Sequence, residues 1–190
     1  MLLLVGLGNP GSNYTNTRHN IGFKIIDAIN AHFKLSKQKP KFKGLLTTGN
    51  IEEKKIYAIK PLTFMNNSGT AVKELIDYFK IDAKDVIVFH DDLDVDFGKI
   101  KTKIGGGSAG HNGIESIDKF IGKDYSRVRI GIGHPKEKKK VNNHVLEDFK
   151  DDEEEKIQEI TESIVKLIPT LIEKKIDLFS SKVNQNLNGI

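Results

Sequence analysis

The chain contains no cysteine among its 190 residues. Disulfides, thiolate metal sites and a cysteine nucleophile are therefore excluded, and the absence fits a cytoplasmic protein. No apolar run approaches the ~18 residues that a membrane span needs. The apolar run from Leu2 to Val5 is also shorter than the ~7 to 15 residues of a secretory signal core. We therefore interpret it as a first strand, and we expect a soluble protein with no membrane association.

Basic residues only slightly outnumber acidic ones: there are 30 lysines and arginines and 26 aspartates and glutamates, which gives a formal net charge of +4. This balance permits a polyanionic partner without requiring one. Lysine-rich stretches lie at 34–43, 99–103 and 136–140, and an acidic block runs from Asp151 to Glu155. The acidic block suits the positive end of a helix that begins there, and each lysine stretch alone is typical of a solvated surface.

Apolar runs bounded by turn residues alternate with apolar side chains at helical spacing. This alternation predicts one α/β domain over residues 1–190, a three-layer sandwich in which helices flank a mixed, mainly parallel twisted sheet. The sheet is expected to be mixed because the runs on either side of 52–55 resemble a hairpin. The predicted strands are 2–6, 45–48, 56–59, 86–89, 100–104 and 128–132, and the predicted helices centre on 21–33, 71–79, 114–121 and 157–168.

Two segments are predicted to be irregular. The lysine- and asparagine-rich segment 136–143 is interpreted as a mobile basic loop, and 184–190 as a frayed tail. Pro169 is predicted to break or kink the last helix.

A histidine follows a glycine-rich turn near the N-terminus. The turn Gly6-Leu-Gly-Asn-Pro-Gly11 comes directly after the first predicted strand, and His19 stands shortly beyond it. Open α/β sheets bind ligands in crevices outside the carboxyl ends of their strands. An unperturbed imidazole titrates near pH ~6.5, so His19 can transfer protons at neutral pH. His19 is a candidate general base, with a purely structural histidine as the alternative.

Three asparagines occupy comparable turn settings with glycine nearby, namely Asn9, Asn66 and Asn112. Each one alone is explained by turn chemistry, because an asparagine side chain mimics a turn and tolerates left-handed angles. An uncharged amide also offers both a donor and an acceptor, which suits the binding of a carbonyl, an amide or water. The set therefore indicates a polar cleft.

The glycine-rich turn also matches Gly-x-Gly-x-x-Gly, which makes a nicotinamide or flavin enzyme an alternative. Three features count against it. Pro10 lies inside the motif, the next helical pattern starts only near Asn20, and no second apolar strand ending in an acidic residue follows. The glycines are better explained by a sharp backbone turn.

A second alternative is a divalent-metal hydrolase, because a buried strand ends in His90, Asp91, Asp92 and Asp94. His90 and Asp91 could ligate a metal, but no further cluster with ligand spacing accompanies them, so no metal site is predicted. A simpler role is that one of the three aspartates hydrogen-bonds a histidine and fixes its tautomer.

The glycine-rich segment Gly105 to Gly113 follows the lysine-bearing strand 99–103 and leads into a helix. Such a segment exposes backbone N–H groups to anions, although a flexible hinge explains the glycines equally well. It is not a Walker loop, since no Gly-Lys-Ser/Thr closes it. On the next strand Arg127 and Arg129 alternate, so both can face one side, either as phosphate contacts or toward solvent.

Six motifs occur in order along residues 6–135: Gly6-Leu-Gly-Asn-Pro-Gly11, Tyr14-x-x-Thr-Arg-His-Asn-x-Gly22, Pro61-x-Thr-Phe-Met-Asn-x-Ser-Gly69, His90-Asp-x-Leu-Asp94, Lys103-x-Gly-Gly-Gly107 with Gly110-His-Asn-Gly113, and Arg129-x-Gly-Ile-Gly-His-Pro135. In this order they closely resemble the motifs of the bacterial-type peptidyl-tRNA hydrolase family. The sequence beyond Pro135 is less distinctive.

The resemblance implies that His19 is the catalytic base and that Asp91 is its orienting partner. It also implies that Lys103 and Arg129 contact phosphates at the end of the tRNA acceptor stem. Asp92 stands where glutamate is common in the family, a change we expect to be harmless because the catalytic partner is its neighbour. The residues that would line the cleft for the peptide and the scissile ester are Asn9, Tyr14, Met65, Asn66 and Asn112.

Such an enzyme would cleave the ester between a peptide, or an N-blocked aminoacyl group, and the 3′-terminal ribose of tRNA, with His19 taking a proton from water. Asn66 or Asn112 would stabilise the oxyanion, and no metal or cofactor is required. The expected partner is peptidyl-tRNA, bound by its acceptor stem and 3′ end largely independently of sequence, so that free tRNA returns to translation. We expect a cytoplasmic monomer.

A non-enzymatic RNA-binding relative is the remaining alternative. The joint presence of His19, Asp91 and the three asparagines argues against it.

Overall fold

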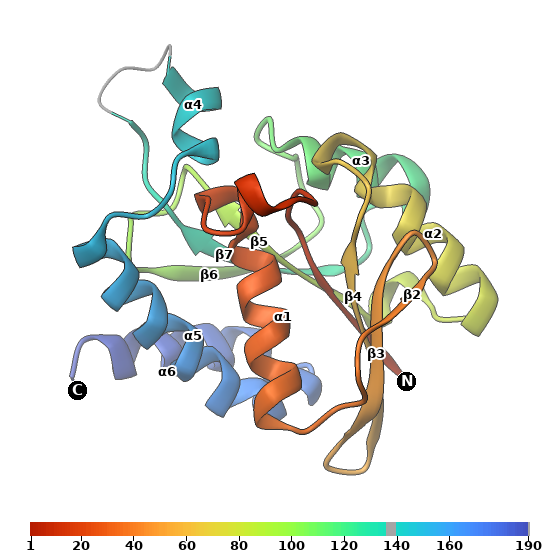
Figure 1. Ribbon diagram of the computed structural model, residues 1–190. Helices are drawn as coiled ribbons and strands as arrows, with labels where there is room; N and C mark the ends of the chain where they lie inside the picture. Colours follow the sequence, from red (N-terminus) through yellow and green to blue (C-terminus); the bar gives the residue numbers. More distant parts are fainter. Residues whose placement is uncertain (136–139, 190) are drawn as a thin grey trace.

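A computed structural model of the protein describes residues 1–135 and 140–189. Its strands are β1 (Leu2–Gly6), β2 (Lys39–Lys41), β3 (Gly44–Ile51), β4 (Lys54–Pro61), β5 (Val86–Asp92), β6 (Ile100–Ile104) and β7 (Ser126–Gly131). They form one sheet in the order β2-β3-β4-β1-β5-β7-β6 (Figure 1). The central strands β4, β1, β5 and β7 are parallel, whereas β2, β3 and β6 pair antiparallel with their neighbours. The predicted mixed sheet and its β3–β4 hairpin are confirmed.

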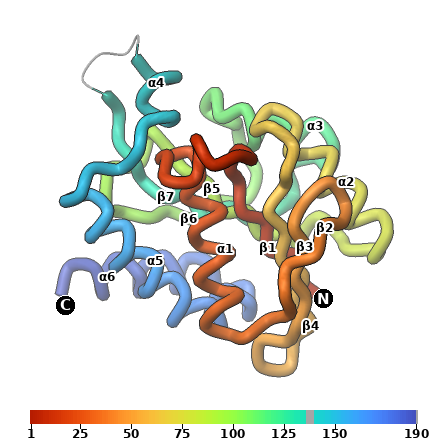
Figure 2. Tube along the Cα trace, in the orientation of Figure 1, coloured from red at the N-terminus to blue at the C-terminus, as the bar shows by residue number. Residues whose placement is uncertain are grey.

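Helices cover both faces of the sheet, as Figure 1 shows. The helices are α1 (Ile21–His32), α2 (Ser68–Phe79), α3 (Asn112–Ile121), α4 (Val141–Leu146), α5 (Asp151–Ile172) and α6 (Ile176–Leu187). Short 3₁₀ turns occupy Ser12–Tyr14, Arg18–Asn20, Met65–Asn67 and Ala83–Asp85. α1, α5 and α6 pack on one face of the sheet, and α2 and α3 pack on the other, which confirms the three-layer sandwich (Figure 2).

The alternation of side chains along β1 divides the core into two parts. Leu2 and Leu4 pack with α1, α5 and α6, whereas Leu3 and Val5 pack with α2 and α3. Successive side chains of a strand point to opposite faces, so a strand that is buried on both faces is a continuous apolar run. The two predicted layers of helices therefore follow from the absence of any polar residue between Leu2 and Val5.

The start of α1 lies against the ends of two strands. A Cβ on Gly22 would come within 2.5 Å of the carbonyl oxygen of Phe89 in β5, and it would also clash with the backbone N of Leu7. Only glycine permits this approach. Ile21, Ile25 and Ile29 are fully buried one turn apart and hold the helix on the sheet. The preceding turn, which carries His19, is thereby fixed at the carboxyl end of the central strands.

Two predictions about the C-terminal region fail, namely a break of the last helix at Pro169 and a frayed tail, whereas a kink at Pro169 stays a prediction. Pro169 does not break α5, which continues to Ile172, because the proline lies near the helix end and Ile168, Leu171 and Ile172 around it are buried in the core. The predicted frayed tail is mostly helical, since α6 extends to Leu187. Within α6 the Asn184 side chain bonds both the backbone N–H and the carbonyl of Ile100, at 3.0 and 2.9 Å, and so covers edge strand β6.

The predicted mobile loop 136–143 is described only in part. Residues 136–139 lie outside the described residues, whereas Val141 begins α4, so the second half of this segment is helical rather than a loop. Ile190, the last residue of the predicted tail, also lies outside them. Among the helices of the described residues, none is both long and apolar enough to cross a membrane.

Candidate active site

Three segments that are distant in sequence meet at the carboxyl ends of the parallel strands. His19 belongs to the 3₁₀ turn Arg18–Asn20, Asp91 lies near the end of β5, and His111 directly precedes α3. Parallel strands end at the same edge of a sheet, and this edge is where such folds bind ligands. Here they enclose a cavity of about 140 Å³ that is lined by all three residues.

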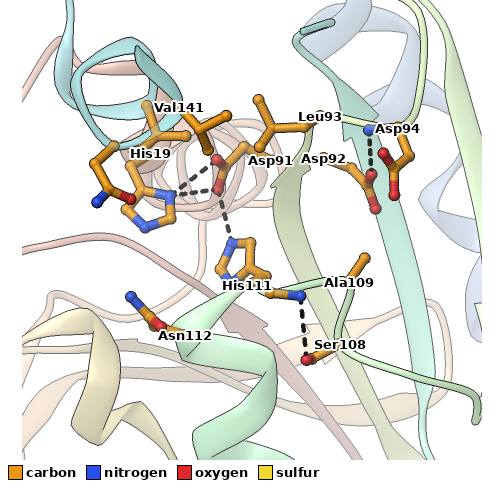
Figure 3. A pocket seen from close by; sticks show the side chains of 13 residues that line it. His19, Asp91, Asp92, Leu93, Asp94, Ser108, Ala109, His111, Asn112 and Val141 are labelled. Atoms are coloured by element: carbon orange, nitrogen blue, oxygen red, sulfur yellow. Dashed lines mark hydrogen bonds and ion pairs between the residues drawn. The ribbon is translucent and has the colours of Figure 1, made fainter. Parts of the chain in front are cut away.

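The imidazole of His19 is held by the carboxylate of Asp91 (Figure 3). Its Nδ1 lies 2.8 Å from Oδ1 and 2.9 Å from Oδ2 of Asp91, and both side chains are buried. In the neutral ring Nδ1–H donates to the carboxylate, which leaves the Nε2 lone pair as an acceptor. Among the described residues, Nε2 of His19 has no hydrogen-bond partner, and His19 lines the cavity. The arrangement can receive a proton from a molecule in the cavity.

The charge of Asp91 controls the titration of this pair. Burial opposes charge on the imidazole, but the charge and the hydrogen bond of Asp91 outweigh it and raise the pKa of His19 above its ordinary value. Burial likewise opposes charge on Asp91, but the two adjacent imidazoles outweigh it and hold the pKa of that carboxyl far below its ordinary value. Asp91 is therefore a carboxylate throughout the physiological range.

His111 is a second partner of Asp91, and the sequence predictions missed it. Its Nε2 lies 2.9 Å from Oδ1 of Asp91. Its Nδ1 accepts hydrogen bonds from the backbone N–H groups of Gly113 and Ile114, at 3.1 and 3.3 Å, and so caps α3. The signal in the sequence is the motif Gly110-His-Asn-Gly113, in which His111 directly precedes the predicted cleft residue Asn112.

The hydrogen bonds of His111 disfavour the metal alternative. His19, Asp91 and His111 bring ligand atoms within 4.8 Å of one another. However, Nδ1 of His111 accepts two N–H groups and is unprotonated, so a metal on Nε2 would require an imidazolate. His90, the other predicted ligand, is fully buried, and its Nδ1–H donates to the Asp91 carbonyl at 2.7 Å. These donors fit a hydrogen-bonded cluster better than a cation site.

Asn9 connects two of the predicted cleft segments. Its Oδ1 accepts the backbone N–H of Met65 at 2.8 Å. Its own backbone N–H and carbonyl are bonded by the Asn20 side chain at 2.9 and 3.0 Å. Because Oδ1 is occupied, the Nδ2 group is the free donor of Asn9, with no partner among the described residues. The amide is thus fixed in orientation before any ligand binds.

Of the other four predicted cleft residues, Asn66 and Asn112 line surface depressions, whereas Met65 and Tyr14 do not line these two. Asn112 lines the His19 cavity and also a shallow depression that contains Asn66. Met65 is buried, and its Sδ lies against Gly113, where a Cβ would come within 2.5 Å of the sulfur. Tyr14 is half-buried and is not among the residues lining the His19 cavity. Of the five predicted cleft residues, Asn112 is the one that reaches His19's cavity.

The two arginines of β7 have different environments. Arg127 is buried, and its guanidinium donates to the carbonyls of Gly105 and Gly107, so the interpretation of Arg127 as a phosphate contact is wrong. Arg129 is half-buried, and its Nε donates to Asp92 at 2.7 Å. Its two terminal NH₂ groups have no partner among the described residues.

Lys103 is exposed and forms no ion pair with the described residues. In the β6–β7 ladder Lys103 lies opposite Arg127 and Lys101 opposite Arg129, so all four side chains share one face of the sheet. Lys101, Lys103 and Arg129 thus form a basic face beside the glycine-rich segment.

Comparisons with known proteins identify the family. The family model described as peptidyl-tRNA hydrolase matches residues 3–189. The chain belongs to the peptidyl-tRNA hydrolase family. Peptidyl-tRNA hydrolase from Pelagibacter ubique is 71% identical over 184 residues, covering 97% of this chain and 99% of the relative. The homologue from Ehrlichia canis is 46% identical over 185 residues, covering 97% and 95%.

Solved structures agree with this assignment. The crystal structure of peptidyl-tRNA hydrolase from Acinetobacter baumannii superimposes with a TM-score of 0.91 at 36% identity, covering 97% of this chain and 94% of that one. A complex of peptidyl-tRNA hydrolase with N-propanol gives the same values. The chain is therefore an enzyme of the hydrolase class with the fold of this family.

In this member of the peptidyl-tRNA hydrolase family, α4 closes one side of the His19 cavity through Val141, Asn142 and Val145. The chain after α4 is attached to the His19 turn by Arg18, which is buried. Arg18 donates to the carbonyls of Glu147 and Asp148 at 3.2 and 2.8 Å and pairs with Glu153 at 2.6 Å. Arg18, the residue before His19, therefore links the His19 turn to the segment that follows α4.

Proposed function

We propose that this protein hydrolyses the ester between the peptide of peptidyl-tRNA and the 3′-terminal ribose, with His19 as the general base. The main support for the proposal is the hydrogen-bond geometry of the His19 imidazole. Nδ1 of His19 is bonded to Asp91 at 2.8 Å, while Nε2, beside the cavity, has no partner in the part of the chain that the structure describes. A neutral imidazole held in this way is oriented to accept a proton from water.

In the proposed reaction, Nε2 of His19 takes a proton from water as the water oxygen attacks the ester carbonyl. The tetrahedral intermediate then collapses, the bond to the ribose oxygen breaks, and the imidazolium returns the proton to that oxygen. Asp91 stabilises the transient imidazolium by its charge and by its hydrogen bond to Nδ1. General acid–base catalysis of this kind contributes about 10²- to 10⁴-fold in rate.

The proposed oxyanion donor is the side-chain amide of Asn112. Asn112 is the first residue of α3 and lines the cavity with His19, whereas Asn66 lines the adjacent depression. A preorganised donor of this type contributes about 2.7–4 kcal/mol to the transition state. The free Nδ2 of Asn9 is suited to a carbonyl of the peptide, since its Oδ1 is already bonded to Met65.

The tRNA is proposed to lie on the basic face of β6 and β7. Lys103 is exposed, and the two NH₂ groups of Arg129 have no partner among residues 1–135 and 140–189, while Asp92 accepts a hydrogen bond from its Nε. Contacts of this kind bind phosphates of the acceptor stem and do not read base edges, so binding would be largely independent of tRNA sequence. We further propose that the protein acts as a cytoplasmic monomer that returns tRNA to translation after ribosome rescue.

The experiment measures tRNA release from an N-acetylated aminoacyl-tRNA in excess EDTA, with unblocked aminoacyl-tRNA as the control substrate. We expect EDTA-resistant cleavage of the blocked ester alone. His19→Ala should abolish turnover while tRNA binding persists. No cleavage by the wild type would support a non-enzymatic RNA-binding protein, EDTA-sensitive cleavage would restore the metal alternative, and normal turnover of His19→Ala would refute the base assignment.

A further inference from the structure

His111 has a proton arrangement that its neighbours determine completely. Its Nδ1 accepts the N–H groups of Gly113 and Ile114, so Nδ1 carries no proton. The single proton of the neutral ring is therefore on Nε2, which lies 2.9 Å from Oδ1 of Asp91. Protonation of Nδ1 would place a hydrogen against two backbone N–H groups. The helix cap thus holds the ring proton of His111 on Nε2, where it faces Asp91.

Asp91 consequently accepts hydrogen bonds from two imidazoles that differ in function. His19 can gain a proton on Nε2 and become charged, whereas His111 cannot without losing its cap. The two rings lie 4.9 Å apart by their centroids. A second donor draws electron density from a carboxylate and so weakens its attraction for a charged neighbour.

The remaining titratable groups near His111 supply no competing charge. His90 of β5 packs edge-on against His111 with centroids 4.9 Å apart, and burial lowers the pKa of His90 to about 3, so it is neutral. Asp92 of β5 is paired with Arg129 of β7. Within the described residues, the Asp91 carboxylate is therefore the one charged group to which His111 is hydrogen-bonded.

We propose that His111 is a positioning residue that joins the first turn of α3 to the Asp91 carboxylate. One ring thereby fixes two parts of the site: it orients the carboxylate that holds His19, and it holds Asn112 at the edge of the same cavity. This inference rests on the proposed function of His19 and Asn112. Beyond that function, we infer that the basicity of His19 depends on the Asp91 carboxylate and also on the hydrogen bond that His111 donates to this carboxylate.

The two roles of His111 are separable by two substitutions. In His111→Asn, the short amide keeps an acceptor at the position of Nδ1, so α3 stays capped, but no donor reaches Asp91. In His111→Gln, the longer amide keeps a donor at the position of Nε2, but the cap is lost. His32→Asn is the matched control, because His32 is exposed at the other end of α1.

The measurements are ¹⁵N NMR titration of the histidines, the pH profile of kcat/KM with N-acetylated aminoacyl-tRNA, and thermal unfolding. We expect His111→Asn to move the His19 titration and the acidic limb of the profile upward by about 0.5–1 pH unit. We expect His111→Gln to leave both midpoints unchanged, to lower Tm by about 2–4 °C and to raise KM. The control should match the wild type.

An unchanged His19 titration in His111→Asn, or a wild-type His111 with its proton on Nδ1, would overturn the inference. Equal effects of His111→Asn and His111→Gln on the His19 titration and on Tm would also overturn the inference, because they would indicate that His111 has only a structural role. The NMR titration needs no substrate. A wild type that releases no tRNA would therefore refute the proposed function while the test of His111 still stands.

Discussion

Replacing Asp91 by asparagine should inactivate the enzyme through a change of tautomer rather than a change of shape. Asp91 accepts three contacts from N–H donors, two from Nδ1 of His19 and one from Nε2 of His111. An asparagine of nearly equal volume offers one oxygen and one NH₂ group. The cap on α3 forces His111 to remain a donor, so the oxygen must take the Oδ1 position beside His111 and the NH₂ group must take the Oδ2 position, which is 2.9 Å from Nδ1 of His19.

The NH₂ group would then require Nδ1 of His19 to accept, which moves the ring proton to Nε2 and removes the lone pair that faces the cavity. We expect kcat to fall by about 10³-fold, within the range that a general base contributes. Single-turnover release of tRNA from an N-acetylated aminoacyl-tRNA measures the loss, and ¹⁵N NMR measures the tautomer. Retention of activity within a few-fold of the wild type, or an unchanged tautomer, would refute the reasoning.

The same geometry predicts a partial recovery in a double variant. Adding His111→Asn to Asp91→Asn removes the donor that captures the asparagine oxygen while α3 stays capped. The oxygen is then free to accept Nδ1–H of His19 and restore the catalytic tautomer. We expect the double variant to exceed Asp91→Asn by about tenfold in kcat, which is about 1.4 kcal/mol of coupling between the sites. A double variant slower than Asp91→Asn would contradict this coupling.

Further predictions concern stability, packing and tRNA binding. Burial holds the pKa of His90 at about 3, below its ordinary 6.5, so the unfolded chain binds the proton first and His90 destabilises the fold as pH falls below 6.5. Between pH 7 and pH 5, the free energy of unfolding measured in urea should fall by on the order of 2 kcal/mol more in the wild type than in His90→Asn. Equal decreases in the two proteins would contradict a neutral buried His90. Gly22→Ala should lower the free energy of unfolding by about 1–3 kcal/mol and should lower kcat, because a Cβ would contact the Phe89 carbonyl. Gly107→Ala is the control: it has open space around it and should leave the free energy of unfolding unchanged in the same assay. Lys103→Gln should lower the slope of log K against log salt for tRNA binding by about 0.7–0.9, while Lys37→Gln before β2 should leave it unchanged; equal slopes in both variants would exclude Lys103 as a phosphate contact.

The sequence predicted strongly periodic elements better than those that depend on tertiary contacts. Buried runs in β1 and β5 were recognisable because both faces of the sheet are covered. α6 was missed because its buried face has only Phe179 and Val183, and its anchor to β6 is a polar residue, Asn184. The edge strand β2 contains Pro40 and exposed lysines, a pattern that propensity assigns to a loop.

For the site, the sequence placed His19 and Asp91 at strand ends, but their pairing was an implication of the family resemblance. Alternation correctly put Arg127 and Arg129 on one face, yet it could not show that the carbonyls of Gly105 and Gly107 would occupy Arg127. The role of His111 depends on its backbone angles and on the start of α3 at Asn112, which lies before the predicted helix 114–121. Such information arises only when the glycine-rich segment is packed against β5.

The cluster at the carboxyl end of the sheet therefore works as one unit in which a single carboxylate controls several groups. Asp91 binds His19 and His111 by its side chain and His90 by its backbone carbonyl. Burial lowers the pKa of His90, and the helix cap occupies Nδ1 of His111. Nε2 of His19 is beside the cavity, whereas Nε2 of His90 is buried without a partner among the described residues, and a second proton on His111 would break its bonds to the first turn of α3. Selectivity of proton transfer in this site thus follows from the burial of His90 and from the helix cap that occupies Nδ1 of His111, and any change that frees Nδ1 of His111 should create a second base and broaden the pH profile.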